Sequence, residues 1–448
     1  MKAVLSNRIY FECLIGSELD ERLSNILTYE IDQQPVSEFP RIVRNVFRVT
    51  DNIVSIPSGR EDLIPEGAGI KDKRVIVDAD IPDPGFTLRG NQQEALDSFE
   101  GQSGIINCKP GWGKSICALA LAHKFQQKTL IVCTTTTIRD MWIKEIREHF
   151  GFEPGIVGGG KCNIDAPIVV GNIQTVRKKA QEFSAQFGIL ILDEVHHCPA
   201  TTFTDFLNAS KASMKIGLTG TMERKDGMHC VFSDYFTDYK FVGNVENTIP
   251  PVIHLYDVGV PMSANQFIPW ANKVTELKKN PIYRKTILAL AKTYAALGHK
   301  VLVVSDRTEF LEYIHLELEN SLIITGAVKG EERDKVMQAV STGSCDILCG
   351  TQAIFSEGVN IPILSCIILA TPMNNAPLTE QLAGRVMRKM EGKLHPVVVD
   401  IRIEGNTAVR HRYTRKGVYI RNGWPMQDYH IGKLLKELNG RDSFTDLL

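Results

Sequence analysis

The chain has 448 residues, of which 43% are hydrophobic and 23% are charged, and its formal net charge at pH 7 is −1. This length exceeds what one hydrophobic core usually organises, so we expect two to four domains. The near-zero charge excludes a protein that binds nucleic acid through a general excess of basic residues, and any polyanionic partner must meet a local basic surface.

Neither the hydropathy pattern nor the cysteines indicate a membrane-bound or secreted protein. No apolar run approaches the roughly 18 residues of a membrane-spanning helix, and the N-terminus lacks a signal-peptide pattern. The ten cysteines include no Cys-x-x-Cys pair, which favours buried, reduced thiols. The spacing of Cys345 and Cys349 could also suit a metal. We therefore expect a cytoplasmic protein that has no membrane contact.

Residues 1–82 are expected to form a small α+β accessory domain. Residues 4–14 and 41–56 are strand-like, residues 19–28 are helix-like, and Pro and Gly residues up to Gly85 mark turns and a linker. Basic residues crowd one strand-like stretch: Arg41, Arg44 and Arg48. A solvated face is the simpler interpretation of these arginines, and contact with nucleic-acid phosphates is the alternative.

From Phe86 onward, strand-like and helix-like segments alternate, which predicts parallel sheets covered by helices on both faces. The expected elements of a first lobe, 83–248, are strands 104–108, 129–133, 168–170, 188–192 and 214–218 and helices 114–126 and 138–149. The expected elements of a second lobe, 249–400, are strands 300–304, 321–324, 345–349, 364–369 and 395–400 and helices 281–297, 307–319, 330–341 and 378–387. Residues 401–448 are expected to be a C-terminal extension with a helix near 427–439. The predicted fold class is therefore α/β, with two tandem lobes after a small α+β domain.

A phosphate-binding loop is predicted between strand 104–108 and helix 114–126. Such a turn directs backbone N–H groups at an anion, and the helix N-terminus adds a partial positive charge. Lys114 can reach the outer phosphates of a nucleotide, and the Ser115 hydroxyl can bind Mg²⁺. The residues expected to bind ATP here are Pro110, Gly111, Trp112, Gly113, Lys114 and Ser115. Just upstream, Gln92 opens a helix and could read the edge of an adenine.

Two acidic residues follow a buried, apolar strand. Ligands of parallel sheets sit at the carboxyl ends of the strands, where Asp193 and Glu194 emerge. We expect Asp193 to hold Mg²⁺, together with Ser115 and partly through water. We expect Glu194 to orient and deprotonate the attacking water.

Two arginines in the second lobe, Arg385 and Arg388, are expected to share one face of helix 378–387, with Gln381 one turn earlier. A solvated basic face is the simpler explanation of an isolated pair. The alternative is that they are arginine fingers, which would stabilise the transferring phosphoryl group of a nucleotide bound by the first lobe. We therefore count Gln381, Arg385 and Arg388 among the catalytic candidates, with Lys114 on the opposite wall of the predicted crevice.

With these stretches in order, residues 86–400 resemble superfamily 2 helicases. The matching motifs are Leu88 to Gln92 (the adenine-reading motif), Lys109 to Ser115 (motif I), Thr134 to Thr137 with Trp142 (Ia), Gly171 to Thr175 (Ib), Asp193 to His196 (II), Gly217 to Thr221 (III), Val301 to Ser305 (IV), Thr325-Gly326, Gly350 to Pro362 (V) and Gln381 to Arg388 (VI). Two positions depart from the usual pattern. Asn360 replaces an Asp in motif V, and Gly220 replaces an Ala in motif III.

The resemblance implies two RecA-like lobes that use ATP and Mg²⁺. It adds Arg89, Gln92, Gly358 and Asn360 to the residues expected to bind ATP. The residues that it implies for contact with the nucleic-acid backbone are Thr134, Arg139, Gln174, Thr175, Ser305, Thr325 and Thr351. Contacts of this kind position a strand without reading its sequence.

Within the superfamily, the chain is similar to the excision-repair branch and to the UvsW-like phage recombination helicases. That similarity implies an ATP-dependent DNA helicase or translocase that unwinds or branch-migrates forks, Holliday junctions and displacement loops. It implies a protein that works as a monomer on DNA and, if phage-encoded, in the host cytoplasm. Three alternatives remain: a duplex translocase without strand separation, an RNA helicase, and an ATP-gated scaffold without turnover.

Overall fold

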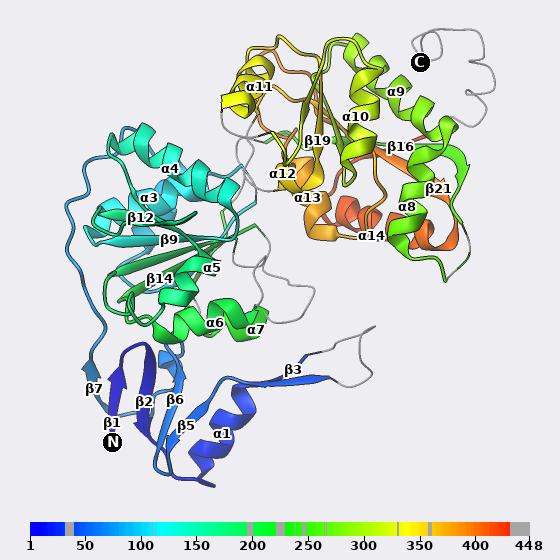
Figure 1. Ribbon diagram of the computed structural model, residues 1–448. Helices are drawn as coiled ribbons and strands as arrows, with labels where there is room; N and C mark the ends of the chain where they lie inside the picture. The colour runs from blue at the N-terminus through cyan, green and yellow to red at the C-terminus, as the bar shows by residue number, and fades with distance from the viewer. Residues whose placement is uncertain are drawn as a thin grey trace, which may run out of the picture. The chain divides into compact units, whose positions relative to one another are not determined.

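The computed structural model describes residues 1–31, 40–109, 111–194, 200–220, 229–237, 239–243, 248–263, 265, 267–328, 331–356 and 361–430. The chain divides into two compact units, Met1–Val245 and Glu246–Leu448. Figure 1 shows the first unit in blue to green and the second in green to red. Each unit is described by itself below.

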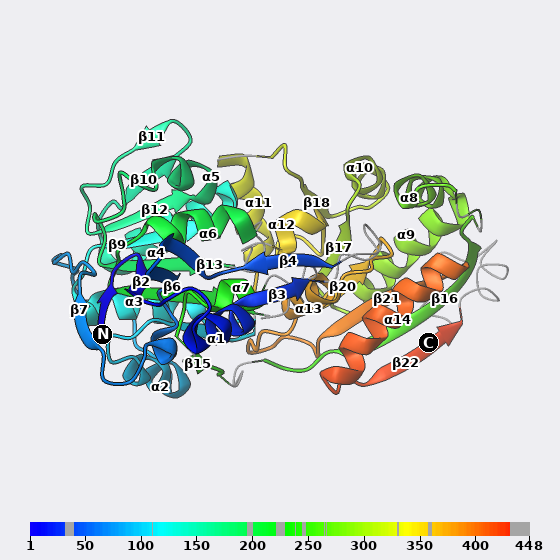
Figure 2. The same cartoon turned by 90° about the horizontal axis from the view of Figure 1, so that it is seen from below.

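The N-terminal part of the first unit is a small α+β structure. Its five-stranded sheet has the order β5-β6-β2-β1-β7, and β3 and β4 form a separate antiparallel pair that runs away from it (Figure 2). Ser17 caps helix α1 because its hydroxyl accepts a hydrogen bond from the Asp20 amide. The elements are β1 (Lys2–Leu5), β2 (Arg8–Glu12), α1 (Glu18–Ile26), β3 (Thr28–Ile31), β4 (Arg41–Arg44), β5 (Phe47–Thr50), β6 (Ile53–Pro57), η1 (Glu61–Leu63) and β7 (Gly69–Asp72).

The rest of the first unit is an eight-stranded sheet of order β11-β10-β12-β9-β13-β14-β8-β15, in which only the short β11 is antiparallel to its neighbour. Its strands are β8 (Gly104–Asn107), β9 (Thr129–Cys133), β10 (Gly155–Gly158), β11 (Lys161–Cys162), β12 (Ile168–Asn172), β13 (Ile189–Asp193), β14 (Met214–Thr219) and β15 (Lys240–Phe241). Its helices are α2 (Gly90–Ser98), α3 (Lys114–Phe125), α4 (Thr136–Phe150), α5 (Ile173–Val176), η2 (Arg177–Lys179), α6 (Ala200–Ala209) and α7 (His229–Ser233). We call this part lobe 1.

Lobe 1 has a hydrophobic core on each face of its sheet. Alternate residues of the central strands point to opposite faces, so Ile131 packs with α3 and α4 while Leu130 packs with α5, α6 and α7. Figure 1 shows these helices on opposite sides of the sheet. Because the sheet is parallel, the carboxyl ends of β8, β9, β12 and β13 come to one edge, where polar residues follow each strand.

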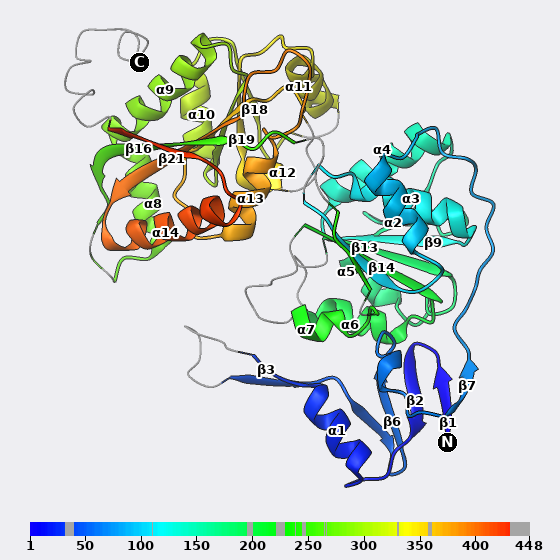
Figure 3. The same ribbon diagram turned by 180° about the vertical axis from the view of Figure 1, so that it is seen from behind.

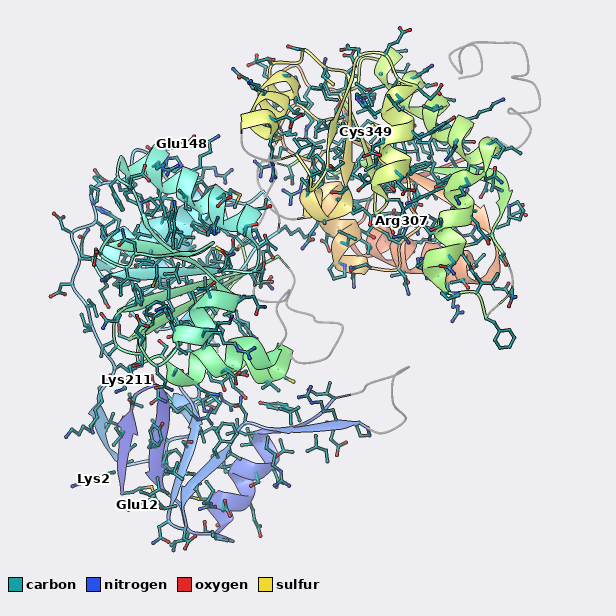
Figure 4. The ribbon with its side chains drawn as sticks, in the orientation of Figure 1. Lys2, Glu12, Glu148, Lys211, Arg307 and Cys349 are labelled. Atoms are coloured by element: carbon teal, nitrogen blue, oxygen red, sulfur yellow. The ribbon has the colours of Figure 1, made fainter. Side chains whose placement is uncertain are left out.

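Buried polar contacts fix the small N-terminal sheet to lobe 1. The Arg8 side chain is 4% exposed and donates to Asn208 Oδ1 at 2.7 Å and to Tyr235 Oη at 3.3 Å. Asp234 accepts hydrogen bonds from Tyr29, Asn45 and Arg60, all in the N-terminal part. Lys215 of β14 donates to Ser58 Oγ at 3.0 Å. Two further backbone contacts close the junction: Val75 N donates to Lys211 O, which is labelled in Figure 4, and a Cβ at Gly59 would overlap Phe236 O.

The second unit, which we call lobe 2, is a seven-stranded, all-parallel sheet of order β18-β19-β17-β20-β21-β16-β22. Its strands are β16 (Val252–Pro261), β17 (Val301–Ser305), β18 (Ser321–Ile324), β19 (Ile347–Thr351), β20 (Cys366–Leu369), β21 (Val397–Glu404) and β22 (Met426–His430). Its helices are α8 (Trp270–Lys279), α9 (Pro281–Ala296), α10 (Thr308–Leu316), α11 (Glu331–Ser341), α12 (Gln352–Ser356), α13 (Ala376–Gly384) and α14 (Asn406–Arg421). Side chains of α8, α9 and α10 pack in the core on one face, and those of α12, α13 and most of α14 in the core on the other. Figure 3 shows α9 and α10 across the sheet from α12 and α13.

A buried ion pair joins α14 to the sheet of lobe 2. Arg415 donates to both carboxylate oxygens of Asp400 at 2.7 to 3.1 Å, and the two residues are 2% and 1% exposed. Tyr419 Oη donates to the same carboxylate, and Arg415 Nη1 donates to Met373 O at 3.0 Å. These contacts hold the segment that leads into α13.

The predicted α/β class with two lobes of parallel strands is confirmed, and most predicted strands differ from the observed ones by no more than two residues. Two predictions about secondary structure were wrong. Residues 426–430 form strand β22, where the start of a helix near 427–439 was expected, because they pair with β16. Residues 431–439 of that expected helix lie outside the described residues. Helix α13 ends at Gly384, so Arg388 does not lie on it and shares no helical face with Arg385. The expected boundary at residue 400 also falls inside β21, and α14 and β22 belong to lobe 2.

The described part of the chain contains no helix long and apolar enough to cross a membrane. Its cysteines are all free thiols, and Cys349 lies inside the sheet of lobe 2 (Figure 4). Among the same residues, no cluster of three or more His, Cys, Asp or Glu side chains could hold a metal, so the spacing of Cys345 and Cys349 has no such consequence.

Candidate nucleotide and nucleic-acid site

The predicted phosphate-binding loop follows β8 and leads into α3. Gly111 and Gly113 have φ angles of 90° and 97°, which only glycine adopts readily, and Gly113 is the residue before the helix. The first turn of α3 contains no acidic residue, so the amides of Lys114 and Ser115 face no competing carboxylate there. Pro110 lies outside the described residues.

The Lys114 side chain folds back over the loop. Its Nζ donates to Cys108 O at 2.8 Å, which keeps the ammonium group at the mouth of the turn. It also lies near Asp193: burial raises the pKa of that carboxyl, and the positive charge of Lys114 offsets part of the rise. Lysine of the first motif and aspartate of the second therefore meet at the carboxyl edge of lobe 1, as expected.

Arg89 and Gln92 hold the loop from the side of α2. Gln92 is 3% exposed, its Nε2 donates to Trp112 O at 3.0 Å, and its Oε1 accepts from the Arg89 amide at 3.0 Å. The Arg89 guanidinium also donates to Trp112 O. A Cβ at Gly113 would overlap Gln92 Nε2. Both polar atoms of the Gln92 side chain are thus engaged within the protein, on the backbone of the loop.

A second clamp on the loop comes from the end of β15. The Trp112 side chain is 1% exposed and lies against Phe241, with 5.7 Å between the ring centroids. The Gly243 amide donates to Cys108 Sγ at 3.1 Å, and a Cβ at Gly243 would overlap Trp112 Nε1. The residues that leave lobe 1 toward lobe 2 therefore pack directly on the phosphate-binding loop.

Asp193 and Glu194 end strand β13 in a buried position. Asp193 is 7% exposed, and its Oδ2 accepts a hydrogen bond from Trp142 Nε1 at 2.8 Å. Burial, and then the neighbouring Glu194, raise the pKa of Asp193. Glu194 has a φ of 50°, an uncommon left-handed conformation for a non-glycine residue and one often found at functional sites.

These residues fit ATP and Mg²⁺. Ser115 and Asp193 offer the hard oxygen ligands that Mg²⁺ prefers, and the glycine turn with Lys114 offers amides and a cation to a triphosphate. The two carboxylates beside each other are costly to bury without a cation, and a divalent ion would offset that cost. The donor set therefore matches the expected cofactors.

The motif VI residues lie at and beyond the end of α13. Gln381 is 4% exposed inside lobe 2, and Arg385 Nε donates to Phe355 O of α12 at 2.6 Å. Arg388 is half-buried and pairs with Thr248 in a short β-bridge. Gly358 and Asn360 of motif V lie outside the described residues.

Four of the residues expected to contact nucleic acid lie at the carboxyl edge of lobe 1. Thr134 follows β9, and Gln174 and Thr175 follow β12, with the Gln174 side chain exposed. Arg139 lies one turn into α4, and its Nη1 donates to Asn172 Oδ1 at 3.1 Å. The edge that holds Asp193 thus also presents these four side chains.

A basic pocket of about 250 Å³ continues this edge toward β10 and β11. Arg139, Arg147 and Lys161 line it, together with Gly158, Gly159 and the acidic Asp140, which forms an ion pair with Arg139. Both glycines have positive φ, and a Cβ at Gly158 would lie 2.6 Å from Asn172 Oδ1. The Arg139 guanidinium is therefore held in place at the floor of a cationic hollow.

The three candidates in lobe 2 differ in exposure. Thr351 ends β19 and is half-buried, and Thr325 follows β18 with 6% exposure. Ser305 is fully buried, and its hydroxyl bonds to Lys278 Nζ at 2.6 Å and to Thr371 Oγ1 at 3.0 Å. Ser305 thus gives its hydroxyl to the interior of lobe 2 and offers a nucleic-acid strand no surface in this structure.

Two family models match the chain: "Type III restriction enzyme, res subunit" over residues 85–224 and "Helicase conserved C-terminal domain" over residues 284–390. The protein "Probable helicase D10" of Escherichia phage T5 is 47% identical over 432 residues, 95% of this chain and 95% of that protein. The chain belongs to the superfamily 2 helicases. As a member of that superfamily it is an ATP-dependent helicase whose partner is a nucleic acid.

More distant relatives of this helicase carry both DNA and RNA names. A mimivirus protein named as an ATP-dependent RNA helicase is 26% identical over 78% of this chain and 71% of its own length. The "ATP-dependent DNA helicase uvsW" of Enterobacteria phage T4 is 25% identical over 69% of this chain and 67% of its own length. Among solved structures, yeast Dbp5 bound to RNA and ADP BeF3 matches with a TM-score of 0.56 and 12% identity, over 78% of this chain and 93% of that one, which shows the shared fold.

Several residues that shape the helicase site were not predicted for that purpose. Trp142 was assigned only to motif Ia, and the structure shows that it holds Asp193. Asn172 orients Arg139, and Gly243 packs against Trp112. A buried Trp needs a partner for its indole N–H, which is a signal for Trp142, but no sequence pattern indicates which carboxylate it meets.

Proposed function

We propose that this helicase is a DNA helicase or translocase that unwinds or branch-migrates forks, Holliday junctions and displacement loops. The observation that carries the proposal is the carboxyl edge of lobe 1, where Lys114 and Asp193 meet beside Thr134, Gln174 and Arg139. The same edge thus carries the residues proposed to hydrolyse ATP and a row of side chains that can bind the phosphates of a nucleic-acid strand. The phage T4 relative, which is named a DNA helicase, supports DNA as the substrate.

In this proposal the loop residues bind ATP with Mg²⁺, whose phosphoanhydride bond supplies the free energy. Lys114 neutralises the outer phosphates, and Ser115 and Asp193 hold the metal ion, partly through water. Glu194 orients and deprotonates the attacking water. The remaining proposed participants are Pro110, Gly111, Trp112 and Gly113 in the loop, Arg89, Gln92, Gly358 and Asn360 toward the nucleoside, and Gln381, Arg385 and Arg388 in hydrolysis.

The proposed strand contacts are hydroxyl, amide and guanidinium groups. Thr134, Arg139, Gln174 and Thr175 in lobe 1, with Thr325 and Thr351 in lobe 2, would bind the backbone and leave the sequence unread. The basic pocket at Arg139 supports this route because three of its side chains are cationic and only one, Asp140, is acidic. We further propose that the protein works as a monomer on DNA, in the host cytoplasm that its phage T5 relative suggests.

A strand-separation assay on forked and four-way DNA tests the proposal. We expect product from the wild-type protein and none from Lys114→Ala or Glu194→Gln. ATP turnover stimulated by DNA without any separated product would favour a duplex translocase instead. Stronger stimulation by RNA than by DNA of equal length would favour an RNA helicase, the function that the mimivirus relative's name supports.

A further inference from the structure

Helix α14 of lobe 2 carries a one-sided charge that the function above does not use. Its 16 residues include five Arg or Lys and no Asp or Glu. They are Arg410, Arg412, Arg415, Lys416 and Arg421. In Figure 2 the helix lies along the outside of lobe 2 beside β21 and β22.

The inner face of α14 is fixed by the core. Arg415 forms a buried ion pair with Asp400, and Val418 and Tyr419 pack against the sheet. The His411 ring lies 4.1 Å from that of Trp270. The neighbouring Arg402 is likewise occupied, by Asp257 and Asp428. The orientation of α14 is therefore set, and the other four basic side chains point elsewhere.

The outer face combines these cations with an exposed aromatic ring. Arg410, Lys416 and Arg421 are exposed, and Tyr413 between them is 61% exposed. The Arg412 guanidinium lies 5.6 Å from the centroid of that ring. Residues 410, 413, 416–417 and 420–421 follow helical spacing, so they form one stripe that is roughly 16 Å long.

Nothing described within lobe 2 neutralises this stripe. Across the described residues, no ion pair involves Arg410, Arg412, Lys416 or Arg421, and exposed Glu404, just before the helix, is the acidic residue closest in sequence. Exposed helices usually mix signs, as Lys144 and Glu148 do on α4. Like charges one turn apart, as at Arg412 and Lys416, instead destabilise a helix. The stripe therefore costs lobe 2 stability that a polyanionic partner would restore.

We propose that the outer face of α14 binds a single-stranded segment of the nucleic acid on which the helicase acts. Arg410, Lys416 and Arg421 contact successive phosphates, and a base stacks on Tyr413. An aromatic ring among cations suits unpaired bases, because a duplex keeps the faces of its bases stacked on one another. This proposal rests on the proposed function, because it adds a contact to the same substrate.

The test compares two variants with the wild-type full chain. In Arg410→Ala/Lys416→Ala/Arg421→Ala, we expect the slope of log affinity against log salt for a single-stranded oligonucleotide to fall by about 2, because each lost phosphate contact removes about 0.7. In Tyr413→Ala, we expect about tenfold weaker binding to the single strand and little change for a blunt duplex. Tyr413→Phe keeps the ring and should bind as the wild type does. Fluorescence anisotropy measures all of these affinities.

The matched control is Lys285→Ala/Lys292→Ala. These two lysines are exposed on α9, against the opposite face of the same sheet, and no ion pair among the described residues uses them. An equal loss of salt dependence per removed cation in the control would mean that any surface cation of lobe 2 serves, and would overturn the proposal. So would unchanged binding by Tyr413→Ala, or an equal loss on the single strand and the duplex.

Failure of this inference can be separated from failure of the proposed function. A wild-type protein whose ATP turnover does not respond to DNA contradicts the proposed function. A wild-type protein that does respond, with α14 variants that bind single strands normally, contradicts only the role of α14. Thermal melts of each variant show whether lobe 2 has stayed folded, and Tyr413→Phe provides a reading that does not depend on a large truncation.

Discussion

At the scale of single residues, the side chains that hold the proposed catalytic groups have the sharpest consequences. Trp142 holds Asp193 Oδ2 from α4, so Trp142→Phe keeps a ring in the core but removes a hydrogen bond to a charged group. Such bonds contribute about 1.5–3 kcal/mol. We expect ATP turnover at saturating ATP to fall about tenfold or more, measured by phosphate release.

The control for Trp142→Phe is Trp424→Phe, a similarly buried Trp in lobe 2. It should leave turnover close to the wild-type value, because Trp424 lies against Tyr419 in the core of lobe 2. Equal turnover in wild type and Trp142→Phe would show that Asp193 needs no such support.

Gly243 allows a close approach that no other residue could make. A Cβ there would overlap Trp112 Nε1 and lie 3.0 Å from Cys108 Sγ, so Gly243→Ala must displace the phosphate-binding loop. We expect the KM for ATP to rise about tenfold, while Gly69→Ala, which has open space around its Cβ position, should not change it. A steady-state ATP titration of both variants decides the matter. A wild-type KM in Gly243→Ala would mean that the residue after β15 does not constrain the position of the loop.

At this scale the sequence predicted the positions of residues that directly follow buried strands. Gly113, Lys114 and Asp193 follow strands, and their positions at the sheet edge agree with the prediction. It failed for Ser305, because a hydroxyl at a strand end can turn to solvent or to the interior, and Lys278 from α8 turns it inward. That lysine lies 27 residues away, in a helix that the sequence did not predict.

At the scale of elements, the buried Arg415–Asp400 pair decides whether α14 and α13 hold their places. Removing one partner leaves an uncompensated buried charge, which typically costs about 3–5 kcal/mol. We expect Asp400→Asn to lower the unfolding free energy of lobe 2 by about that amount in chemical denaturation. Asp257→Asn, which weakens the more exposed pair with Arg402, should cost less than about 1 kcal/mol. Similar losses in both variants would contradict this account.

Helix α14 also shows why some elements could not be predicted from the sequence. Strands 129–133 and 321–324 were predicted with their observed bounds, because each is a short run of mostly apolar residues; the first is fully buried and the second partly buried. Helix α14 was not predicted, because its mean hydropathy is low and its apolar residues are few. Its position depends on Asp400, a contact that no local pattern reveals.

At the scale of the whole molecule, Lys215 makes the stability of the first unit depend on pH. Burial lowers its pKa to about 7 in the folded protein, against about 10.4 in an unfolded chain. Between these values the unfolded chain binds more protons, so the unfolding free energy must rise with pH. We expect a gain of roughly 3 kcal/mol from pH 7.5 to 10 from this group. Denaturation midpoints at the two values measure it.

Lys215→Met provides the comparison for that titration. It removes the buried amine, so its unfolding free energy should lack the rise that we assign to Lys215. Because other groups titrate equally in both proteins, the difference between the two curves isolates this one. Parallel curves for wild type and variant would show that the amine stays charged in the folded protein.

The alternation of strands and helices was enough to predict the two parallel sheets, but not the attachment of the N-terminal sheet to lobe 1. Its contacts come from isolated polar residues spread over the chain, including Arg8, Asn45, Ser58, Asn208 and Asp234. None of these residues belongs to a motif, and each is of a type that is common on protein surfaces. Only the fold shows that they meet.

That attachment bears on how the chain is made. Arg8 leaves the ribosome some two hundred residues before its partners Asn208 and Tyr235. Until then the Arg8 guanidinium stays in water, and one face of the N-terminal sheet lacks the residues that it packs against. The N-terminal sheet and lobe 1 therefore mature together, late in synthesis, and a nascent chain arrested before residue 236 should be a substrate for chaperones.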